Sequence, residues 1–425
     1  MKKKSILASA LLLAVTTVLL LHGCFKDTGT RQYKVYTPVL QTSAQVRASV
    51  KSDLSQPIVN AGKMYVLGNT IFLCEKEKGI HIIDNSNPAS PINKAFINIP
   101  GNEDIAVKGN FLYADCYTDL LIIDISDPNA VVLKNYAPNL FPDRRYVNGY
   151  FVDSGKVITT WTVRDTIANL QIQQGQGIWN NGSFIVPIMY GGYLLTATSN
   201  ASVATQTGVA GSMSKLAIVQ DHLFAVDQDL LLSISIASPA NPNYQSNKNL
   251  HLGIGTAETI FPFQDKLFIG STSGMYIFSI SNPDNPNLLS TFSHARVCDP
   301  VITDGINAYI TLHAGTFCGG IENELDVVNV QNILSPYLFK KYTLTKPMGL
   351  SKDGNTLMIC DAGLKVYDAT DPNNLQLKQT INIADAYDVI CINGTAIVSA
   401  KDGLYQYDYS NLSNVKLLSK LSITQ

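Results

Sequence analysis

The sequence lacks the short motifs that mark common enzyme classes. It has no Gly-x-Ser-x-Gly elbow, no His-Glu-x-x-His helix, no Gly-x-x-x-x-Gly-Lys phosphate loop and no EF-hand loop. Its six histidines are scattered along the chain. We therefore expect no cofactor and lean against an enzyme, although carboxylates that are distant in sequence can still meet in a fold.

The chain also has little charge of either sign. Charged residues make up 15% of the 425 residues, and the formal net charge is -2. Without Lys2, Lys3 and Lys4 the balance is 28 basic against 33 acidic residues. A mildly acidic chain without a basic stripe is a poor match for nucleic acid, so we expect no such partner. The content of 20 Tyr, 18 Pro and 29 Gly favours short strands and turns over helices.

The first 23 residues have the pattern of an export signal. Lys2 to Lys4 form a positive start, and the apolar run from Ile6 to Leu21 is too short and too close to the start for a stable membrane span. The run ends at Leu21-His22-Gly23-Cys24, which resembles the lipobox of bacterial lipoproteins, in which the cysteine is acylated. We expect residues 1–23 to be a lipoprotein signal peptide and Cys24 to hold the protein at a membrane through its lipid. The alternative is a plain secretory leader with an incidental cysteine.

Residues 24–55 then have the composition of a polar tether, without periodicity. Phe25-Lys26-Asp27 resembles the short charged export signal of surface lipoproteins of Bacteroidetes. The expected location is accordingly extracytoplasmic, at the outer membrane or cell surface.

The rest of the chain, residues 56–425, is built from a repeated unit that is clearest between Asp104 and Pro128. Three short strands are predicted there, at 105–108, 111–114 and 120–125, and the unit closes at Ser126-Asp127-Pro128, where proline prevents strand continuation. Similar units start roughly every 40 to 48 residues, the period of four-stranded propeller blades. A fourth strand follows, as at 288–292. We predict an all-β fold, a β-propeller of four-stranded blades.

The number of blades depends on how residues 146–212 are interpreted. Two strand-like runs lie between Tyr146 and Val163, and a Gln- and Gly-rich insertion covers about 164–211. If this stretch is a degenerate blade with an insertion, the ring has eight blades, which is the count we expect. If it is wholly an insertion, the ring has seven.

Three of the repeated strands carry a family resemblance. Ile80-His-Ile-Ile-Asp84, Leu120-Leu-Ile-Ile-Asp124 and Leu364-Lys-Val-Tyr-Asp368 resemble the LVIVD repeat of bacterial and archaeal surface proteins. Over about 60–410 the chain is similar to LVIVD-repeat lipoproteins of Bacteroidetes. The resemblance implies a β-propeller at the cell surface, and it implies no catalytic activity.

Acidic and arginine residues recur in the loops that should meet at one end of the ring. In a propeller, the loops that lead into each inner strand share one face with the loops between second and third strands; we name this the loop-lined face. Convergent loops on a rigid scaffold form binding sites, although a single carboxylate in a loop more often caps a turn. The candidate ligand-binding residues are Asp104, Arg145, Glu258, Arg296, Asp299, His313 and Asp361.

These features predict a binding or scaffold module that takes a glycan, a peptide or an envelope protein at the loop-lined face. One alternative is a glycan-active hydrolase or lyase that uses two carboxylates of this face as acid and base. The other is a purely structural surface protein, whose axis would be plugged.

Cys298 and Cys318 should reach the same face of one blade, close to His294 and His313. A disulfide suits an exported protein and is the pairing we favour. A Cys2His2 metal site needs four converging ligands, and this spacing matches no recognised zinc finger, so we expect no metal. Two free thiols are the third reading. The remaining strand cysteines, Cys74, Cys116, Cys360 and Cys391, are expected to be buried small residues.

Overall fold

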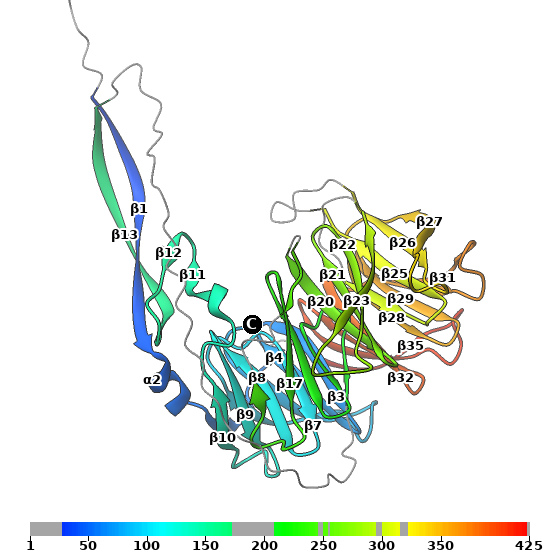
Figure 1. Cartoon of the computed structure of the whole chain (residues 1–425), viewed down its shortest axis with the longest axis horizontal. Coiled ribbons are helices and arrows are strands. Elements are labelled where there is room, and N and C mark those ends of the chain that lie inside the picture. Colours follow the sequence, from blue (N-terminus) through cyan, green and yellow to red (C-terminus); the bar gives the residue numbers. More distant parts are fainter. Residues whose placement is uncertain are drawn as a thin grey trace, which may run out of the picture. The chain divides into compact units, whose positions relative to one another are not determined.

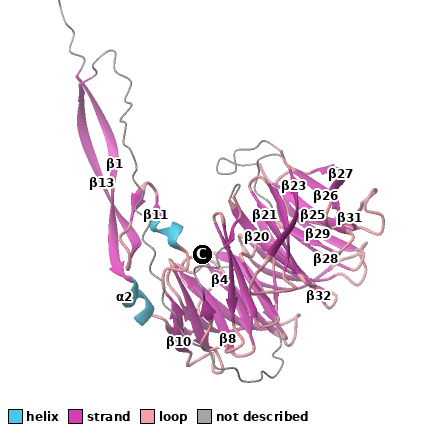
Figure 2. Ribbon diagram, in the orientation of Figure 1, coloured by secondary structure: helices cyan, strands magenta, loops and turns pink. Residues whose placement is uncertain are grey.

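The computed structural model describes residues 28–171, 208–244, 250–253, 256–294, 300–314 and 322–422. Strands predominate in this part of the chain, which also contains the short helix α2 (Ser43–Ala48) and the 3-10 helix η1 (Pro142–Arg145) (Figure 2). The chain divides into two compact units, which are described separately: one spans residues 1–39 and 160–190, and the other spans residues 40–159 and 191–425.

In the described part of the larger unit, consecutive antiparallel strands form seven sheets of four or more strands, coloured from light blue to red along the chain in Figure 1. Each of these sheets is a blade, and its consecutive strands follow in chain order from the inner to the outer edge. Two further strands, described below, extend the edges of the first blade. The first blade contains β3 (Ala61–Leu67), β4 (Thr70–Glu75), β5 (Gly79–Asp84) and β6 (Ile92–Asn98), and the second contains β7 (Ile105–Lys108), β8 (Phe111–Cys116), β9 (Asp119–Asp124) and β10 (Val132–Ala137). The third contains β15 (Leu216–Val219), β16 (His222–Asp227) and β17 (Leu230–Ser235), and its outer position is shared by β18 (Asn243–Tyr244) and β19 (Leu250–His251).

The fourth to seventh blades each contain four unbroken strands. The fourth contains β20 (Ala257–Phe263), β21 (Lys266–Ser271), β22 (Gly274–Ser279) and β23 (Asn287–Ser293), and the fifth contains β24 (Val301–Thr303), β25 (Asn307–Leu312), β26 (Glu324–Asn329) and β27 (Tyr337–Thr343). The sixth contains β28 (Pro347–Asp353), β29 (Thr356–Asp361), β30 (Leu364–Asp368) and β31 (Gln376–Ile381), and the seventh contains β32 (Ala386–Ile392), β33 (Thr395–Ala400), β34 (Gly403–Asp408) and β35 (Lys416–Ser422).

The blades close into a ring by packing alone. The inner strand of each blade contacts the inner strand of the next, and β32 of the seventh blade returns to β3 of the first. At this closure Ile397 and Leu404 pack with Ile71 and Leu73 in one buried apolar cluster. No single blade could bury both of its apolar faces, and stacking in a ring buries them while leaving only short strand edges exposed. The predicted propeller of four-stranded blades is therefore confirmed.

The ring has seven blades, the alternative count, and not the eight that we favoured. The strands between Tyr146 and Ser212 pair elsewhere: β11 (Tyr146–Val147) pairs with β12 (Tyr150–Phe151) across Asn148-Gly149, and β14 (Val209–Ala210) pairs with β3. Asn148 and Gly149 have φ values of 50° and 82°, which is the backbone that a two-residue hairpin turn requires. The remaining described strand of this stretch, β13 (Lys156–Gln171), pairs with β1 (Thr28–Thr42). None of the described strands of the stretch counted as an eighth blade therefore forms a blade.

The aspartate that ends each LVIVD-like strand has a structural role. Oδ1 of Asp124 accepts the backbone N–H of Ser126 at 3.0 Å, and its Oδ2 lies 3.3 Å from Nζ of Lys134 on the outer strand. The same N–H bond, to the residue two positions on, is made by Asp84, Asp368 and Asp408. The hydrogen bonds from Ser126 lower the pKa of Asp124. This carboxylate thus ends the third strand in a local turn and holds a lysine on the blade's edge.

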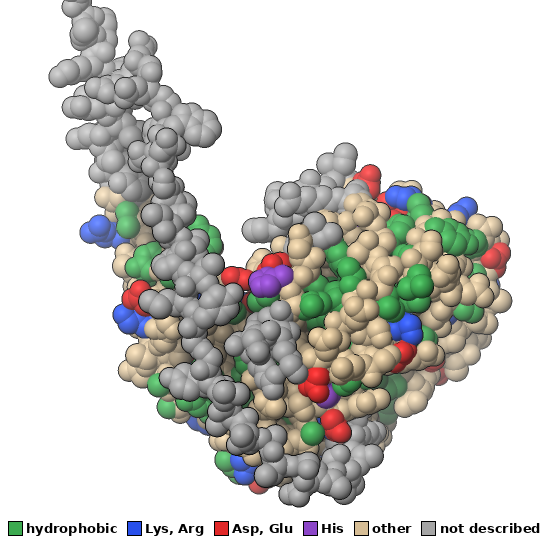
Figure 3. Space-filling model, viewed as in Figure 1, with side chains coloured by type: hydrophobic (Ala, Val, Ile, Leu, Met, Phe, Trp, Pro, Cys, Tyr) green, Lys and Arg blue, Asp and Glu red, His purple; other side chains and the backbone are tan. Residues whose placement is uncertain are grey.

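The outer strands expose alternate side chains, including the apolar residues Ile92, Val132, Leu288 and Leu417. Figure 3 shows apolar side chains dispersed between polar ones on the surface in view. The inner and middle strands, in contrast, are buried on both faces; Leu120 to Ile123 of β9 are at most 1% exposed.

In the described part of the smaller unit, β1 (Thr28–Thr42) and β13 (Lys156–Gln171) form a two-stranded sheet, and the Thr162 hydroxyl donates to the Thr37 carbonyl at 3.2 Å. The stretch predicted as a tether therefore includes β1, α2 and β2 (Lys51–Leu54), of which β2 extends the first blade beside β6. Residues 1–27, with Cys24, lie outside the described part of the chain.

Candidate functional site

Three blades hold their incoming loop through a carboxylate at the end of the second strand. In each case the buried carboxylate accepts two backbone N–H groups of the loop that leads into the inner strand. The pairs are Glu75 with Val59 and Asn60 (3.0 and 2.6 Å), Asp115 with Glu103 and Asp104 (2.7 and 3.0 Å), and Asp361 with Thr345 and Lys346 (2.9 and 2.6 Å). These carboxylates satisfy loop donors that would otherwise be unpaired, so they fix the loop-lined face.

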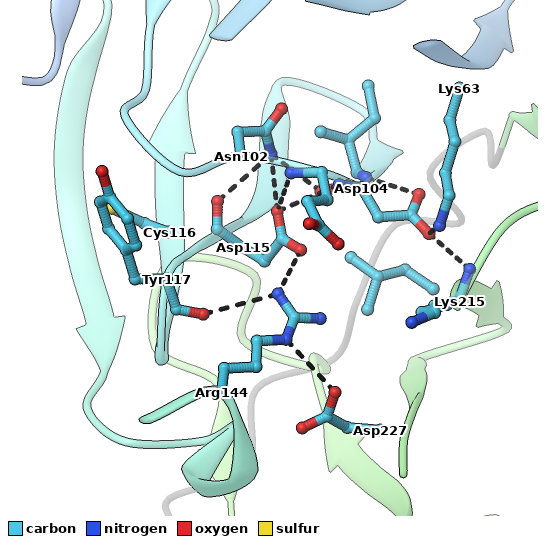
Figure 4. A network of polar contacts seen from close by, with 12 residues as sticks. Lys63, Asn102, Asp104, Asp115, Cys116, Tyr117, Arg144, Lys215 and Asp227 are labelled. Atoms are coloured by element: carbon cyan, nitrogen blue, oxygen red, sulfur yellow. Dashed lines mark hydrogen bonds and ion pairs between the residues drawn. The ribbon is translucent and has the colours of Figure 1, made fainter. Parts of the chain in front are cut away.

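Arg144 links the second and third blades at this face (Figure 4). Its Nη1 donates to Asp115 Oδ2 at 2.7 Å and its Nε donates to Asp227 Oδ1 at 3.2 Å. The guanidinium also lies over the Phe141 ring, 4.3 Å from the centroid. Burial alone would lower the pKa of Arg144, but the charges of Asp115 and Asp227 outweigh it and raise that pKa. The arginine therefore stays charged and ties β8 to β16.

Asp104 forms a second buried ion pair beside the first (Figure 4). Its Oδ2 lies 2.8 Å from Nζ of Lys63 on β3, and it accepts hydrogen bonds from the Ser214 hydroxyl and the Lys215 backbone N–H. Burial would lower the pKa of Lys63, but the attraction of Asp104 outweighs it and raises the pKa. Asp104 thus joins the first and second blades to the chain that enters the third.

The chain before β15 runs through the inside of the ring. Gly208–Ser214, which we name the axial segment, contacts the inner strands of several blades: the Gly211 N–H donates to the Met64 carbonyl (3.2 Å), the Leu350 N–H donates to the Ser212 hydroxyl (2.9 Å), and the Ile260 N–H donates to the Ser214 carbonyl (2.8 Å). Met64, Leu350 and Ile260 belong to the first, sixth and fourth blades. A segment that bonds to blades so far apart in the ring must lie at its axis.

Asp388 of β32 holds the axial segment from the seventh blade. Its Oδ1 accepts the Ser212 hydroxyl at 3.0 Å and the Val389 N–H at 2.9 Å. A Cβ atom on Gly211 would lie 1.9 Å from Asp388 Oδ2, and one on Gly349 would lie 2.2 Å from Oδ1, so only glycine fits at either position. Complete burial of the carboxylate raises the pKa of Asp388 to about 7.

Three polar side chains remain at the loop-lined end of the axis, and we name them the mouth cluster: Glu103, Lys215 and Tyr387. Glu103 is exposed, and the other two are half-buried. Within the described part of the chain, the Glu103 carboxylate and the Lys215 ammonium have no hydrogen-bond partner. Burial, together with the charges of Lys63 and Arg144, lowers the pKa of Lys215, and burial raises the pKa of Tyr387 to about 12. The charge of Glu103 acts on both Lys215 and Tyr387, so an acid, an amine and a phenol lie near one another at the starts of three inner strands.

The structure places the described candidate residues in different blades. Asp104 lies in the buried network, and Asp361 holds the loop of the sixth blade and pairs with Lys365. Arg145 turns away from the network, with its guanidinium 4.9 Å from the centroid of the Phe151 ring. Glu258 is a half-buried residue of β20.

His313 follows β25, and burial lowers its pKa, with Lys346 contributing. Arg296, Asp299, Cys298 and Cys318 lie outside the described residues. The thiols of Cys74, Cys116 and Cys360 are free and buried, as expected, whereas Cys391 is free and half-buried. Burial raises the pKa of Cys116 to about 12, so this thiol stays protonated.

Sequence reasoning missed Lys63, Lys215 and Ser212. Each lies at or near the start of an inner strand, but nothing local distinguishes them from other polar residues at strand ends. Their partners, Asp104 and Asp388, lie 41 to 176 positions away.

No helix in the described part of the chain is long and apolar enough to cross a membrane. The LVIVD repeat model matches residues 60–98 and 102–136, which cover the first two blades. No curated protein matches the chain.

Several solved structures are similar to this chain at low sequence identity. One is PorZ, a bacterial surface component of the type-IX secretion system of Porphyromonas gingivalis (12% identity, 86% of this chain and 39% of that chain, TM-score 0.48). Others are BamB from Moraxella catarrhalis (11%, 87% and 99%, 0.44) and the WD40 β-propeller domain of Doa1 (10%, 87% and 96%, 0.45). Likeness at this level says nothing about function. The chain carries LVIVD repeats on a seven-bladed β-propeller.

Proposed function

We propose that the protein is a lipid-anchored, extracytoplasmic binding or scaffold module whose ligand contacts the mouth cluster. The observation that carries this proposal is a contrast at the loop-lined face. Arg144 and Asp104 form buried ion pairs there, whereas the side chains of Glu103 and Lys215 have no hydrogen-bond partner among the described residues. The backbone N–H groups of Glu103 and Lys215 are bonded to the buried carboxylates of Asp115 and Asp104, so the backbone at both residues is already fixed before a ligand binds.

Three carboxylates of this face already have hydrogen-bond and ion-pair partners within the protein, which favours binding over glycan hydrolysis. Asp115 and Asp361 accept loop N–H groups and pair with Arg144 and Lys365, and Asp104 is bound to Lys63. An acid and base pair needs groups that can exchange protons with a substrate and water. Carboxylates that already satisfy the fold are poorly suited to that role.

The chemistry of the mouth cluster suits a polar ligand with both donors and acceptors. Glu103 can accept hydrogen bonds from hydroxyl groups, Lys215 can donate to ring or carbonyl oxygens, and the Tyr387 ring offers an apolar face with a polar tip. A glycan presents all three features, so it is the ligand class that we propose first. A peptide or a polar patch of an envelope protein is the alternative.

The experiment compares the full chain with a Glu103→Gln, Lys215→Ala double variant. Thermal shift and release of reducing ends are measured against envelope and dietary polysaccharides. We expect a polysaccharide that raises the melting temperature of the wild-type protein without product release, and a loss of that shift in the double variant. Lys416→Ala, at an exposed lysine of the seventh blade, is the matched control and should leave the shift unchanged. Product release would establish the hydrolase instead, and the absence of any shift would favour a structural protein.

A further inference from the structure

A cavity of about 180 Å³ lies beside the axial segment. Its walls include Val209 and Ala210 of the axial segment, Ile218 of β15, and Ile260, Phe261 and Pro262 of β20. These wall residues of β15 and β20 lie in the later halves of the two inner strands, whereas the loop-lined face lies at the starts of the inner strands. The cavity is therefore a different site from the mouth cluster, toward the opposite end of the ring.

One wall of this cavity is the edge of a strand that has no partner among the described strands. β14 is the first strand of its sheet, and of the described strands it pairs with β3 alone. The Gly211 N–H donates to the Met64 carbonyl, and in an antiparallel pair the hydrogen-bonding groups of successive residues alternate between the two edges. The N–H and C=O of Ala210 are thus turned away from β3, toward the cavity.

The side chains of the facing wall offer Ala210 no hydrogen bond. The Ile260 N–H is already bonded to the Ser214 carbonyl at 2.8 Å, and Pro262 has no N–H. The side chains of Ile218 and Phe261 are apolar. A backbone donor and acceptor beside an apolar wall are costly to leave unpaired, so the cavity matches a ligand that brings its own amide together with an apolar group.

The size of the cavity limits the ligand to a short segment. At roughly 30 Å³ for each water, 180 Å³ corresponds to about six waters. That is room for about one apolar residue of an extended chain, with its neighbours outside the cavity, and for nothing folded. Glycan rings fit this site poorly, because their hydroxyl groups would lose hydrogen bonds against the apolar wall.

We propose that the cavity binds an extended apolar peptide segment of a partner chain, which adds a strand to the free edge of β14. The backbone of the segment pairs with the N–H and C=O of Ala210, and an apolar side chain packs between Ile218 and Phe261. Main-chain hydrogen bonds supply affinity in this mode, and the apolar wall selects the side chain.

Ala210→Pro tests the backbone pairing directly. It deletes the N–H on the free edge and leaves the ladder to β3 intact, since proline is tolerated where its missing N–H faces away from the sheet. Val209, the residue before it, already has the extended backbone that precedes proline. Ala210→Ser keeps the N–H and is the matched control.

The probes are N-acetyl-Leu-Leu N-methylamide, its analogue methylated on both leucine nitrogens, and N-acetyl-Ser-Ser N-methylamide. Titration calorimetry on the full chain should detect the Leu-Leu probe and not the Ser-Ser probe. We expect the methylated analogue, and the Ala210→Pro variant with the unmodified probe, to bind at least tenfold more weakly, while Ala210→Ser binds like wild type.

Two results would overturn the proposal. The first is equal binding of the methylated and unmethylated Leu-Leu probes, which means that the cavity takes apolar groups without strand pairing. The second is no binding of any probe at millimolar concentration. If Ala210→Pro fails to fold, as judged by its unfolding midpoint, the comparison of the two Leu-Leu probes on the wild-type chain decides alone.

Discussion

The Asp388 carboxylate accepts a hydrogen bond from the Ser212 hydroxyl at 3.0 Å, across 176 positions of sequence. This bond fastens the axial segment to the last blade of the ring. The Asp388 carboxylate is buried there: Gly211 and Gly349 approach it closely, and the titratable groups of Lys63 and Cys360 lie near it. Its Oδ2 has no hydrogen-bond partner among the described residues.

The first prediction concerns pH. The pKa of Asp388 is raised from 3.8 to about 7 in the folded protein, so between these values the folded state holds a proton that the unfolded state has released. The contribution of Asp388 to the free energy of unfolding is therefore least unfavourable below pH 4, falls as the pH rises toward 7 and is constant above it. Asp388→Asn removes this dependence and should raise the unfolding free energy at pH 8 by a few kcal/mol.

Urea unfolding at pH 4.5 and pH 8 measures this effect. Asp353→Asn, at the end of β28, is a control whose carboxylate shows no comparable burial. A drop in stability with rising pH that is as large in Asp388→Asn as in the wild-type protein would assign the dependence to other groups.

The second prediction separates two adjacent arginines. Arg144→Ala leaves the buried carboxylates of Asp115 and Asp227 without their cation and should lower the free energy of unfolding by about 3 kcal/mol. Arg145→Ala loses a contact with an exposed ring and a bond to the Pro142 carbonyl, and should cost less than about 1 kcal/mol. Chemical denaturation of both variants makes the comparison, and equal costs would show that the Arg144 network contributes nothing particular.

The third prediction concerns Asp361, which was a candidate ligand residue. Asp361→Ala leaves the N–H groups of Thr345 and Lys346 without their acceptor and should destabilise the protein by about 2 kcal/mol. Binding at the mouth cluster should persist in this variant at temperatures where it is folded. Lost binding together with unchanged stability would instead make Asp361 a ligand contact.

The fourth prediction concerns the anchor. We expect Cys24→Ser to move the protein from the membrane to the soluble fraction of cells, because the proposed acylation needs the thiol. Metabolic labelling with a fatty-acid analogue should mark the wild-type protein and not the variant. Continued membrane fractionation of an unlabelled variant would refute lipid anchoring at this residue.

Much of the fold was predictable because the repeated unit is local. Strands such as Leu120–Ile125 are bounded by turn residues a few positions away, so their ends and period can be read without knowing any partner. The blade count was not predictable in the same way. Residues 156–171 and 209–210 are compatible with strands, but β13 pairs with β1 and β14 pairs with β3, and local sequence does not specify such distant partners.

The candidate site was predictable in kind and not in detail. Loop carboxylates were expected at this face, and Asp104 and Asp361 are indeed in loop-fixing contacts, in line with their ordinary role as turn residues. Arg144 enters the buried network and Arg145 does not, because the turn of η1 directs these adjacent side chains differently. The axial segment could not be foreseen, since its contacts are spread over five blades.

Hydrogen exchange of the axial segment tests the central claim most directly. If Gly208–Ser214 fills the axis of a closed ring, the amide of Gly211 should exchange as slowly as those of the inner strands, because it donates to the Met64 carbonyl of β3. Mass spectrometry of peptides covering 208–216 reports this in the native protein. Exchange of these peptides within seconds, while β3 and β32 stay protected, would show that the segment does not occupy the axis.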